Sequence, residues 1–178
     1  MMLTLVLVLV LTLLTVLLWR PVKSYLTYRG ERLITCPGNG EPAAVRVKSG
    51  HAALHSNEPL SRLAIKDCSR WPVRKECGQG CLNEVVADPT STRVDNIVTK
   101  WYEGKSCAFC AKPIDHLNWS DHRAAFLGVD GTTREWETVP AEDLPDIFST
   151  SQPVCWSCHI AESFRQRFPE LVTNRPEH

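Results

Sequence analysis

The chain has 178 residues, enough for one or two small modules but too few for a large multidomain enzyme. Its 20 basic and 20 acidic residues give a formal net charge of zero, which excludes a bulk electrostatic attraction of the whole protein to nucleic acid. Eight cysteines are more than an ordinary core needs and too sparse for a pure disulfide scaffold. The composition therefore indicates metal, haem or disulfide chemistry, and the cysteine spacing must distinguish these.

The N-terminal segment 1–19 is an uncharged run of mainly leucine and valine whose only polar side chains are three threonines. As a helix it would extend about 27–29 Å, which matches the hydrocarbon core of a bilayer. A cleavable secretory signal would have a basic region before a shorter apolar stretch and small residues at its end. This run has none of these and ends at Trp19, Arg20 and Pro21. We therefore predict an uncleaved single-pass transmembrane helix over residues 1–19.

Basic residues follow this segment and none precedes it. The juxtamembrane linker, residues 20–32, carries four Lys or Arg residues and Glu31 as its only acidic residue. Because Lys and Arg are retained on the cytoplasmic side of a membrane, we predict the N-terminus outside and the soluble domain in the cytoplasm. A reducing cytosol disfavours structural disulfides, so this topology predicts that the cysteines bind metal.

Residues 33–104 are predicted to form a first cysteine-rich module with both helices and strands. Three β-prone runs bounded by turn residues are expected to be strands, namely 33–36, 43–47 and 60–65. Two later stretches are expected to be helices, namely 73–87 and 91–102. The first two strands should form a hairpin, because a connection rich in proline and glycine joins them.

Residues 105–171 are predicted to form a second module, followed by a tail over residues 172–178. The dipeptide Asp130-Gly131 is a strong hairpin signal between two expected strands. The expected elements, in chain order, are strands over 123–129 and 132–138, an acidic helix over 140–148 and a helix over 160–171. The complete chain is thus predicted to be an α+β protein with an N-terminal transmembrane helix.

Two pairs of cysteines in the second module have the spacing of metal ligands. Thiolates presented two at a time from tight turns suit a tetrahedral Zn²⁺, and the pairs are Cys107-x2-Cys110 and Cys155-x2-Cys158. The second module resembles the treble-clef zinc finger, because a cysteine turn, a hairpin and a second cysteine pair at a helix start follow one another along the chain. The resemblance covers residues 105–171 and implies one zinc ion, with the last two ligands on the first turn of the final helix. The 44 residues between the pairs exceed the spacing of simple fingers, and the hairpin and short helix account for the excess.

The first module contains the other four cysteines, Cys36, Cys68, Cys77 and Cys81. If the predicted helix over 73–87 forms, Cys77 and Cys81 lie one turn apart on one face, where both thiols can bind the same metal ion. We expect a second zinc site made of these four thiolates. An alternative ligand for one of them is His51 or His55, and the competing interpretation is that these cysteines are unpaired structural residues.

The second module also contains the CxxCH pattern of covalent c-type haem attachment. In that interpretation Cys155 and Cys158 form thioethers to haem and His159 is the proximal iron ligand. The other axial ligand would be a histidine such as His116 or His122, because both methionines lie in the N-terminal run. The protein would then be an exported electron carrier, which conflicts with the predicted cytoplasmic topology.

A third interpretation comes from a resemblance to treble-clef nucleases of the His-Asn-His type. In such enzymes an acidic-His pair on the hairpin supplies a general base, and a residue of the final helix helps to hold a catalytic cation. Asp121-His122 and His159 resemble those parts. No asparagine follows the hairpin in a glycine-rich context, and the net negative charge of residues 113–178 would repel phosphate.

The chain shows no nucleophile–base pair, phosphate loop or dinucleotide-binding fingerprint, so an enzymatic role is disfavoured. Zinc held by four thiolates contributes folding free energy and leaves no coordination position for a substrate. We therefore expect a membrane-anchored zinc protein that tethers, assembles or regulates a partner protein at the cytoplasmic face. Trp71, in a turn between cysteines, is the candidate residue for contacting that partner.

Overall fold

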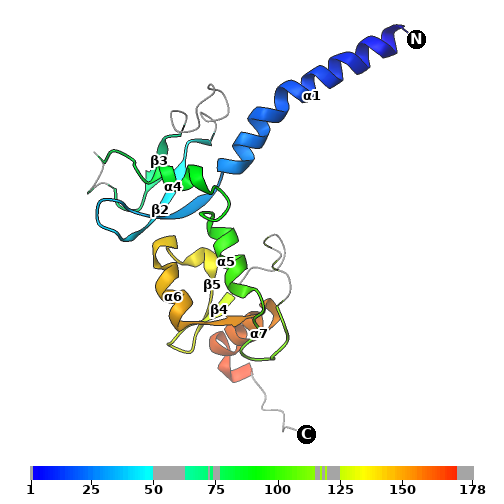
Figure 1. Ribbon diagram of the computed structural model, residues 1–178. Helices are drawn as coiled ribbons and strands as arrows, with labels where there is room; N and C mark the ends of the chain where they lie inside the picture. The colour runs from blue at the N-terminus through cyan, green and yellow to red at the C-terminus, as the bar shows by residue number, and fades with distance from the viewer. Residues whose placement is uncertain are drawn as a thin grey trace. The chain divides into compact units, whose positions relative to one another are not determined.

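The computed structural model describes residues 2–49, 63–71, 73, 77–114, 117, 119 and 125–171. The chain mixes helices with short strands and divides into two compact units, residues 1–94 and 95–178 (Figure 1). Each unit contains its own three-stranded antiparallel sheet. The boundary falls near the start of the helix that we expected to close the first module, so most of that helix belongs to the second unit.

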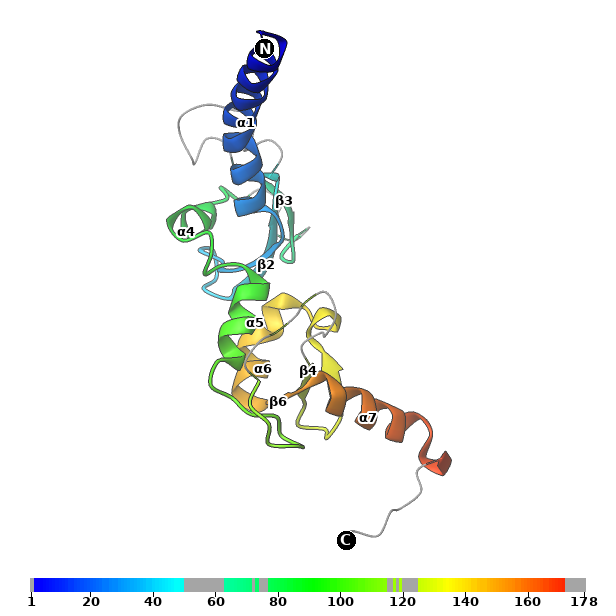
Figure 2. The ribbon, with the colours of Figure 1, turned by 90° about the vertical axis from the view of Figure 1, so that its right-hand side faces the viewer.

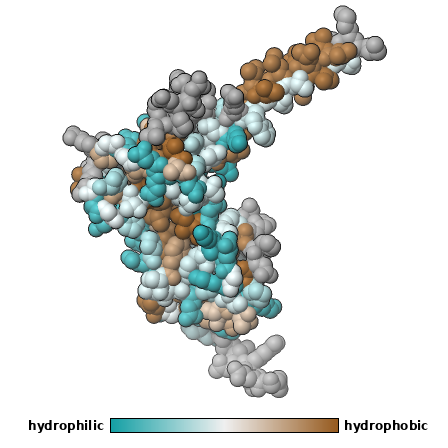
Figure 3. All heavy atoms as spheres, in the orientation of Figure 1, coloured by the Kyte–Doolittle hydropathy of each residue, from teal (hydrophilic) through white to brown (hydrophobic). Residues whose placement is uncertain are grey.

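The first element is a single long helix, α1 (Met2–Tyr28). Its segment Thr4–Tyr28 is long and apolar enough to cross a membrane, and no residue in the apolar stretch of 18 residues that meets this test is buried within the protein. Apolar side chains cover its surface (Figure 3). The helix continues past Trp19 and through Pro21, beyond the expected end of the apolar run. Much of the expected linker is therefore helical.

The sheet of the first unit has the strand order β1-β2-β3. Strands β1 (Glu31–Thr35) and β2 (Pro42–Val47) form the predicted antiparallel hairpin, with Leu33 opposite Ala44. The third strand, β3 (Ile65–Cys68), pairs with β2 and begins where we expected a strand to end. Residues 60–62 of that expected strand lie outside the described part of the chain.

One short helix completes the core of the first unit. It is α4 (Leu82–Ala87), whose Leu82 and Val85 are buried with Ile34, Val45 and Ile65 of the sheet. The longer helix predicted over 73–87 is wrong in its first half, because residues 77–80 are not helical. Gln79 there adopts a positive φ of 51°, a conformation that a right-handed helix excludes.

The second unit opens with α5 (Val94–Tyr102), which Gly104 follows at a φ of 71° as predicted for a helix end. Its sheet has the order β5-β4-β6, with β4 (Ala125–Leu127) between β5 (Thr133–Glu135) and β6 (Gln152–Val154). The β4–β5 hairpin turns at Asp130-Gly131, as expected.

The helices of the second unit lie on either side of β6 in the sequence. The predicted acidic helix is α6 (Leu144–Thr150), preceded by a 3-10 turn at Ala141–Asp143. The final helix is α7 (Trp156–Arg167), which directly follows β6 (Figure 2). Two further 3-10 turns occur at Trp136–Thr138 and Pro169–Leu171. The expected strand over 132–138 is therefore shorter than predicted and ends at Glu135.

Aromatic side chains fill the core of the second unit. Trp101 packs edge-on against Tyr102 and Trp136, with ring centroids 4.9 Å and 5.3 Å apart respectively. Phe126 of β4 and Phe148 of α6 also contact Trp136. The indole of Trp136 donates a 2.8 Å hydrogen bond to the Tyr102 hydroxyl, which in turn donates to the carbonyl of Ala125. These contacts join α5, β4 and α6 into one core.

Candidate metal centre

The first cysteine pair of the second unit lies on a tight turn. The amide of Ala111 donates to the carbonyl of Cys107 at 2.9 Å, and Ala111 has the left-handed φ of 56° that such a turn needs. The amide of Cys107 donates in turn to Lys112, also at 2.9 Å. A bond from the Ala108 amide to the carbonyl of Pro153 attaches this turn to β6. The turn therefore holds its two thiols beside the end of that strand.

The second pair lies where β6 becomes α7. Cys155 occupies the N-cap position of the helix with an extended backbone, and Cys158 lies in its first turn. The helix begins at Trp156, four residues earlier than expected, because the His159 amide already donates to the carbonyl of Cys155 at 3.0 Å. A helix start thus presents both thiols toward the turn of the first pair.

The two pairs meet in one group of four sulfurs. The Sγ atoms of Cys107, Cys110, Cys155 and Cys158 all lie within 4.8 Å of one another, and those of Cys110 and Cys155 are 3.8 Å apart. Cys107 is buried and Cys110 is exposed, so the group lies at the edge of the unit. Four thiol ligands at this spacing suit a tetrahedral metal such as Zn²⁺. Among the described residues, no other group of three or more such ligand atoms meets this distance.

The four thiols differ in how readily they ionise. Burial opposes ionisation of Cys107, but backbone amides of Cys155, Cys110 and Phe109 outweigh it and lower the pKa to about 6. The amide of Cys155 lies 3.3 Å from that sulfur. Burial instead raises the pKa of Cys155, and burial together with the neighbouring sulfurs raises the pKa of Cys158. Cys107 therefore ionises more readily than Cys155 and Cys158.

His159 follows the last cysteine but points into protein. Its ring is buried, with Nδ1 2.9 Å from the hydroxyl of Thr133 and Nε2 3.7 Å from the carboxylate of Glu135. These contacts hold the ring against β5. The other histidines and the aspartate of the haem and nuclease interpretations lie outside the described residues, namely His116, Asp121 and His122.

The structure brings the four cysteines of the first unit to one cavity but not into a compact group. Cys36, Cys68, Cys77 and Cys81 all line a cavity of about 360 Å³. Cys77 and Cys81 do not share a helical face, because Cys77 lies in a loop and Cys81 precedes α4. The alternative ligands His51 and His55 lie outside the described residues.

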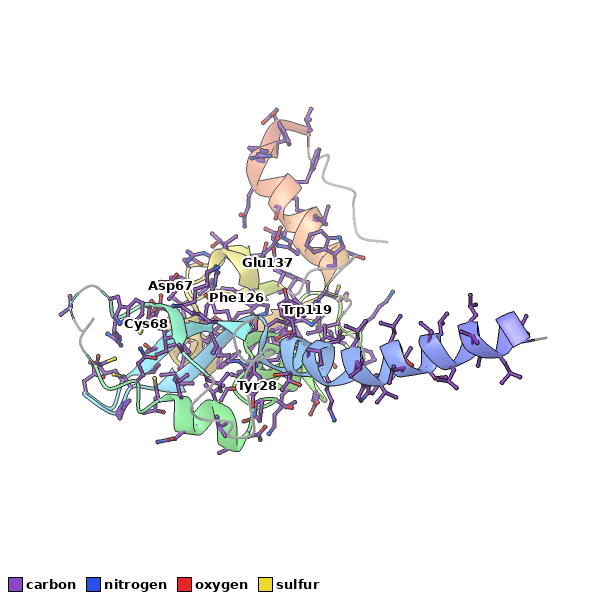
Figure 4. All side chains as sticks on the ribbon, turned by 90° about the horizontal axis from the view of Figure 1, so that it is seen from above. Tyr28, Asp67, Cys68, Trp119, Phe126 and Glu137 are labelled. Carbon is purple, nitrogen blue, oxygen red and sulfur yellow. The ribbon has the colours of Figure 1, made fainter. Side chains whose placement is uncertain are left out.

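The cavity lies beside the hydrophobic core of the first unit. Burial, followed by the nearby sulfurs of Cys77 and Cys68, raises the pKa of Cys81 to about 11. Figure 4 labels Cys68 at the end of β3. Trp71, the predicted contact residue for a partner, is partly buried and packs against this core. Its indole nitrogen is buried without a hydrogen-bond acceptor among the described residues.

Sequence reasoning missed β6, the strand that carries the second cysteine pair to the first. A proline in a short run argues against a central strand, and Pro153 is the middle residue of β6. The structure resolves this conflict because β6 is an edge strand that pairs with β4 alone. Burial rises along this strand from exposed Gln152 to buried Val154 without the period-2 alternation that would have marked a strand in the sequence.

No protein-family model, curated protein or solved structure matches this chain. Its class is therefore defined by its own fold and site. It is a mixed helix-and-sheet protein with a four-cysteine group that could hold a metal ion and one N-terminal helix long and apolar enough to cross a membrane.

Proposed function

We propose that this chain is a membrane-anchored zinc protein with a structural role, which tethers, assembles or regulates a partner protein at the cytoplasmic face. The observation that carries the proposal is the group of four sulfurs within 4.8 Å of one another. Zn²⁺ bound by Cys107, Cys110, Cys155 and Cys158 would have no open position for a substrate or an activated water. The ion would then contribute folding free energy and no chemistry.

The arrangement around the four thiols supports a treble-clef-like metal site. A cysteine turn, the β4–β5 hairpin and a helix with cysteines at its start occur in that order along the chain. The insertion of α6 and β6 between hairpin and helix accounts for the long spacing between the pairs. In this proposal zinc joins the turn at Cys107 to the start of α7, which are separated by more than 40 residues.

The anchoring part of the proposal depends on α1. A helix of 27 residues extends about 40 Å, which exceeds the hydrocarbon core of a bilayer and leaves its last turns for the headgroup region. The basic residues Lys23 and Arg29 lie near that end, where the positive-inside rule favours the cytoplasm. The domain that follows would then face a reducing compartment suited to zinc thiolates.

A surface on α7 supports the interaction part of the proposal. Ile160, Phe164 and Phe168 follow one another at intervals of four residues and are 49%, 48% and 37% exposed. The Phe164 and Phe168 rings contact each other in a tilted arrangement, with centroids 5.2 Å apart. We assign this apolar face of α7 to the partner protein, because zinc would fix the start of the same helix in place.

The same four-sulfur group favours zinc over haem and over nuclease chemistry. Covalent haem would consume Cys155 and Cys158, leaving Cys107 and Cys110 without the partners they have here. It would also need the His159 ring at the iron, whereas that ring contacts Thr133 and Glu135. A nuclease would need the His159 ring to help hold a catalytic cation, whereas that ring is buried against β5.

Metal analysis with an absorption spectrum on the full chain in detergent tests the central claim. We expect zinc in the purified protein and no Soret band. The double variant Cys110→Ser/Cys155→Ser should lose the ion held by the second unit, whereas Ser149→Ala, an exposed control in α6, should retain it. A Soret band that survives acid-acetone extraction would overturn the proposal in favour of haem attachment.

Topology and docking need separate tests. A C-terminal reporter that is active only in the cytoplasm should be active, and its silence beside an active exported reporter would overturn the predicted orientation.

A photo-crosslinking residue at position 164 should yield one discrete product that is lost with Phe168→Ser. The same probe at exposed position 166 should yield none. Equal crosslinking at both positions would remove the α7 face from the proposal.

A further inference from the structure

A cavity in the first unit collects all four cysteines that the second unit does not contain. The cavity measures about 360 Å³ and is lined mainly by apolar and small residues. Cys36, Cys68, Cys77 and Cys81 reach it from three places, the ends of β1 and β3 and the segment before α4. Its lining includes no carboxylate and no imidazole among the described residues, so sulfur is its only soft ligand.

Two of these cysteines begin turns of the type that presents a thiol outward. The carbonyl of Cys36 accepts hydrogen bonds from the amides of Asn39 at 3.3 Å and Gly40 at 2.8 Å. The carbonyl of Cys68 accepts one from the amide of Trp71 at 3.0 Å. Strands β1 and β3 both pair with β2, so the sheet determines where these two turns lie.

The other two cysteines lie on a loop that is fastened to both of those strands. Gln79 accepts a 3.0 Å hydrogen bond from the amide of Ile65 at the start of β3. A Cβ added at Gly80 would lie 3.7 Å from the ring of Pro37, so the loop lies against the turn after Cys36. Glu84 of α4 accepts a 3.0 Å bond from the amide of Thr35. Cys77 and Cys81 are thereby held on the cavity.

Arg70 is the only charged residue in the lining described, and it has an unused donor. Its guanidinium bonds the carbonyl of Pro42 at 2.8 Å and the carboxylate of Glu41 at 3.1 Å. The Nε atom is buried and has no hydrogen-bond acceptor among the described residues. A metal with four thiolates carries a net charge of −2, and a guanidinium with a free N–H is the group that would offset it.

We propose that the first unit binds its own Zn²⁺ through Cys36, Cys68, Cys77 and Cys81. Each compact unit then contains one tetrathiolate site. None of these four cysteines belongs to the metal centre of the second unit, and all of them lie in the other compact unit. Because α4 begins only at Leu82, no helix holds the segment that carries Cys77 and Cys81. The zinc would instead connect that segment to the sheet.

The site is more open than that of the second unit. Among the described residues, no three of its sulfurs meet the 4.8 Å spacing seen there. Cys77 is exposed and adjoins Gly78, so it is the ligand with backbone freedom to complete the set. An open site with an exposed ligand exchanges its metal faster than a closed one, so the first unit should release zinc to a chelator before the second.

Zinc counting on paired variants of the full chain in detergent tests this proposal. We expect two zinc ions per wild-type chain, one in Cys68→Ser/Cys77→Ser and one in Cys110→Ser/Cys155→Ser. Cys77 is exposed, and Cys68 packs against the hydrophobic core but is only partly buried, so the first variant changes no fully buried side chain. Lys66→Ala, exposed on β3 and with no thiol, is the matched control and should retain two ions.

The outcomes separate the two proposals. A wild-type count of one that Cys110→Ser/Cys155→Ser abolishes and Cys68→Ser/Cys77→Ser does not would overturn the site in the first unit alone. A count of one with the opposite pattern would overturn the second unit's site and support this one. If the first variant fails to fold, Co²⁺ binding to Cys110→Ser/Cys155→Ser replaces it, because only the first unit's four cysteines are then complete. Tetrathiolate charge-transfer absorption in that variant supports the proposal, and its absence overturns it.

Discussion

The Arg32 side chain, which is completely buried, donates a 2.7 Å hydrogen bond to the hydroxyl of Thr92. The same guanidinium also bonds the carbonyls of Thr27, at the end of α1, and Pro89. It lies 5.8 Å from the centre of the Tyr28 ring. One arginine thereby links α1, β1 and the turn after α4. The planar guanidinium suits this position because its N–H groups point at several acceptors in fixed directions, which the single ammonium group of lysine could not do.

Replacing that arginine should destabilise the first unit. Arg32→Ala leaves the Thr92 hydroxyl and two carbonyls without their charged donor, and we expect a loss of about 3 kcal/mol. Faster amide exchange in β1 and β2, read by mass spectrometry, is the measurement. Arg46→Ala removes an exposed ion pair with Glu31 on the same hairpin and should cost about 0–1 kcal/mol. Equal effects of the two changes would contradict the linking role of Arg32.

Removing one hydroxyl should weaken the core of the second unit. Tyr102→Phe deletes the acceptor for the buried Trp136 indole and should cost about 1–3 kcal/mol. The midpoint of urea unfolding, followed by tryptophan fluorescence, should fall accordingly. Tyr25→Phe makes the same chemical change at an exposed position of α1 and should leave the midpoint unchanged. An unaltered midpoint in Tyr102→Phe would mean that another acceptor or water replaces the hydroxyl.

Metal removal should loosen a defined part of the second unit. Without a metal, the turn at Cys107 and the start of α7 keep only hydrogen bonds such as that from Ala108 to Pro153. We expect a strong chelator to raise amide exchange in β6 and the first turn of α7 more than in α5, whose Val98 and Tyr102 are buried in the aromatic core. Uniform exchange across the unit would contradict a local role for the ion.

Zinc binding to the second unit should release protons in a number set by the thiol pKa values. At pH 7 the pKa of about 6 leaves Cys107 mostly ionised, whereas the raised pKa values keep Cys155 and Cys158 protonated. We therefore expect fewer protons per ion than the four thiol ligands, because Cys107 has almost none to release. At pH 5, below the pKa of Cys107, that thiol adds about one more proton, and affinity falls.

Calorimetry in buffers of different ionisation enthalpy measures this proton release. The apo form of Cys68→Ser/Cys77→Ser is the appropriate sample, because only the second unit then has all four of its cysteine ligands. Four protons at pH 7 would show that Cys107 is not ionised before the metal binds. A count that does not change between pH 7 and pH 5 would contradict its pKa of about 6.

Much of the local structure was predictable because neighbouring residues determine it. The apolar run of α1, the turn between β1 and β2, and Asp130-Gly131 in the second hairpin each indicate their structure within a few residues. The two CxxC pairs likewise indicated a shared metal site, and the structure brings their sulfurs together. The second half of the helix predicted over 73–87 is α4, but the prediction was wrong for residues 77–80, where two glycines and the positive φ of Gln79 oppose a helix.

Other features depended on residues far apart in the chain. The residues next to Arg32 in the sequence do not distinguish it from the basic residues that flank a membrane helix. Its side chain is nevertheless completely buried, and its hydrogen-bond acceptor Thr92 is 60 residues away. Strand β6 was hidden by Pro153 and exists because β4 offers it an edge. Which thiols, turns and apolar runs the protein contains can be read from the order of its residues. Which thiols meet and which charge is buried can be read only from the folded chain, because non-local hydrogen bonds and sheet pairing determine both.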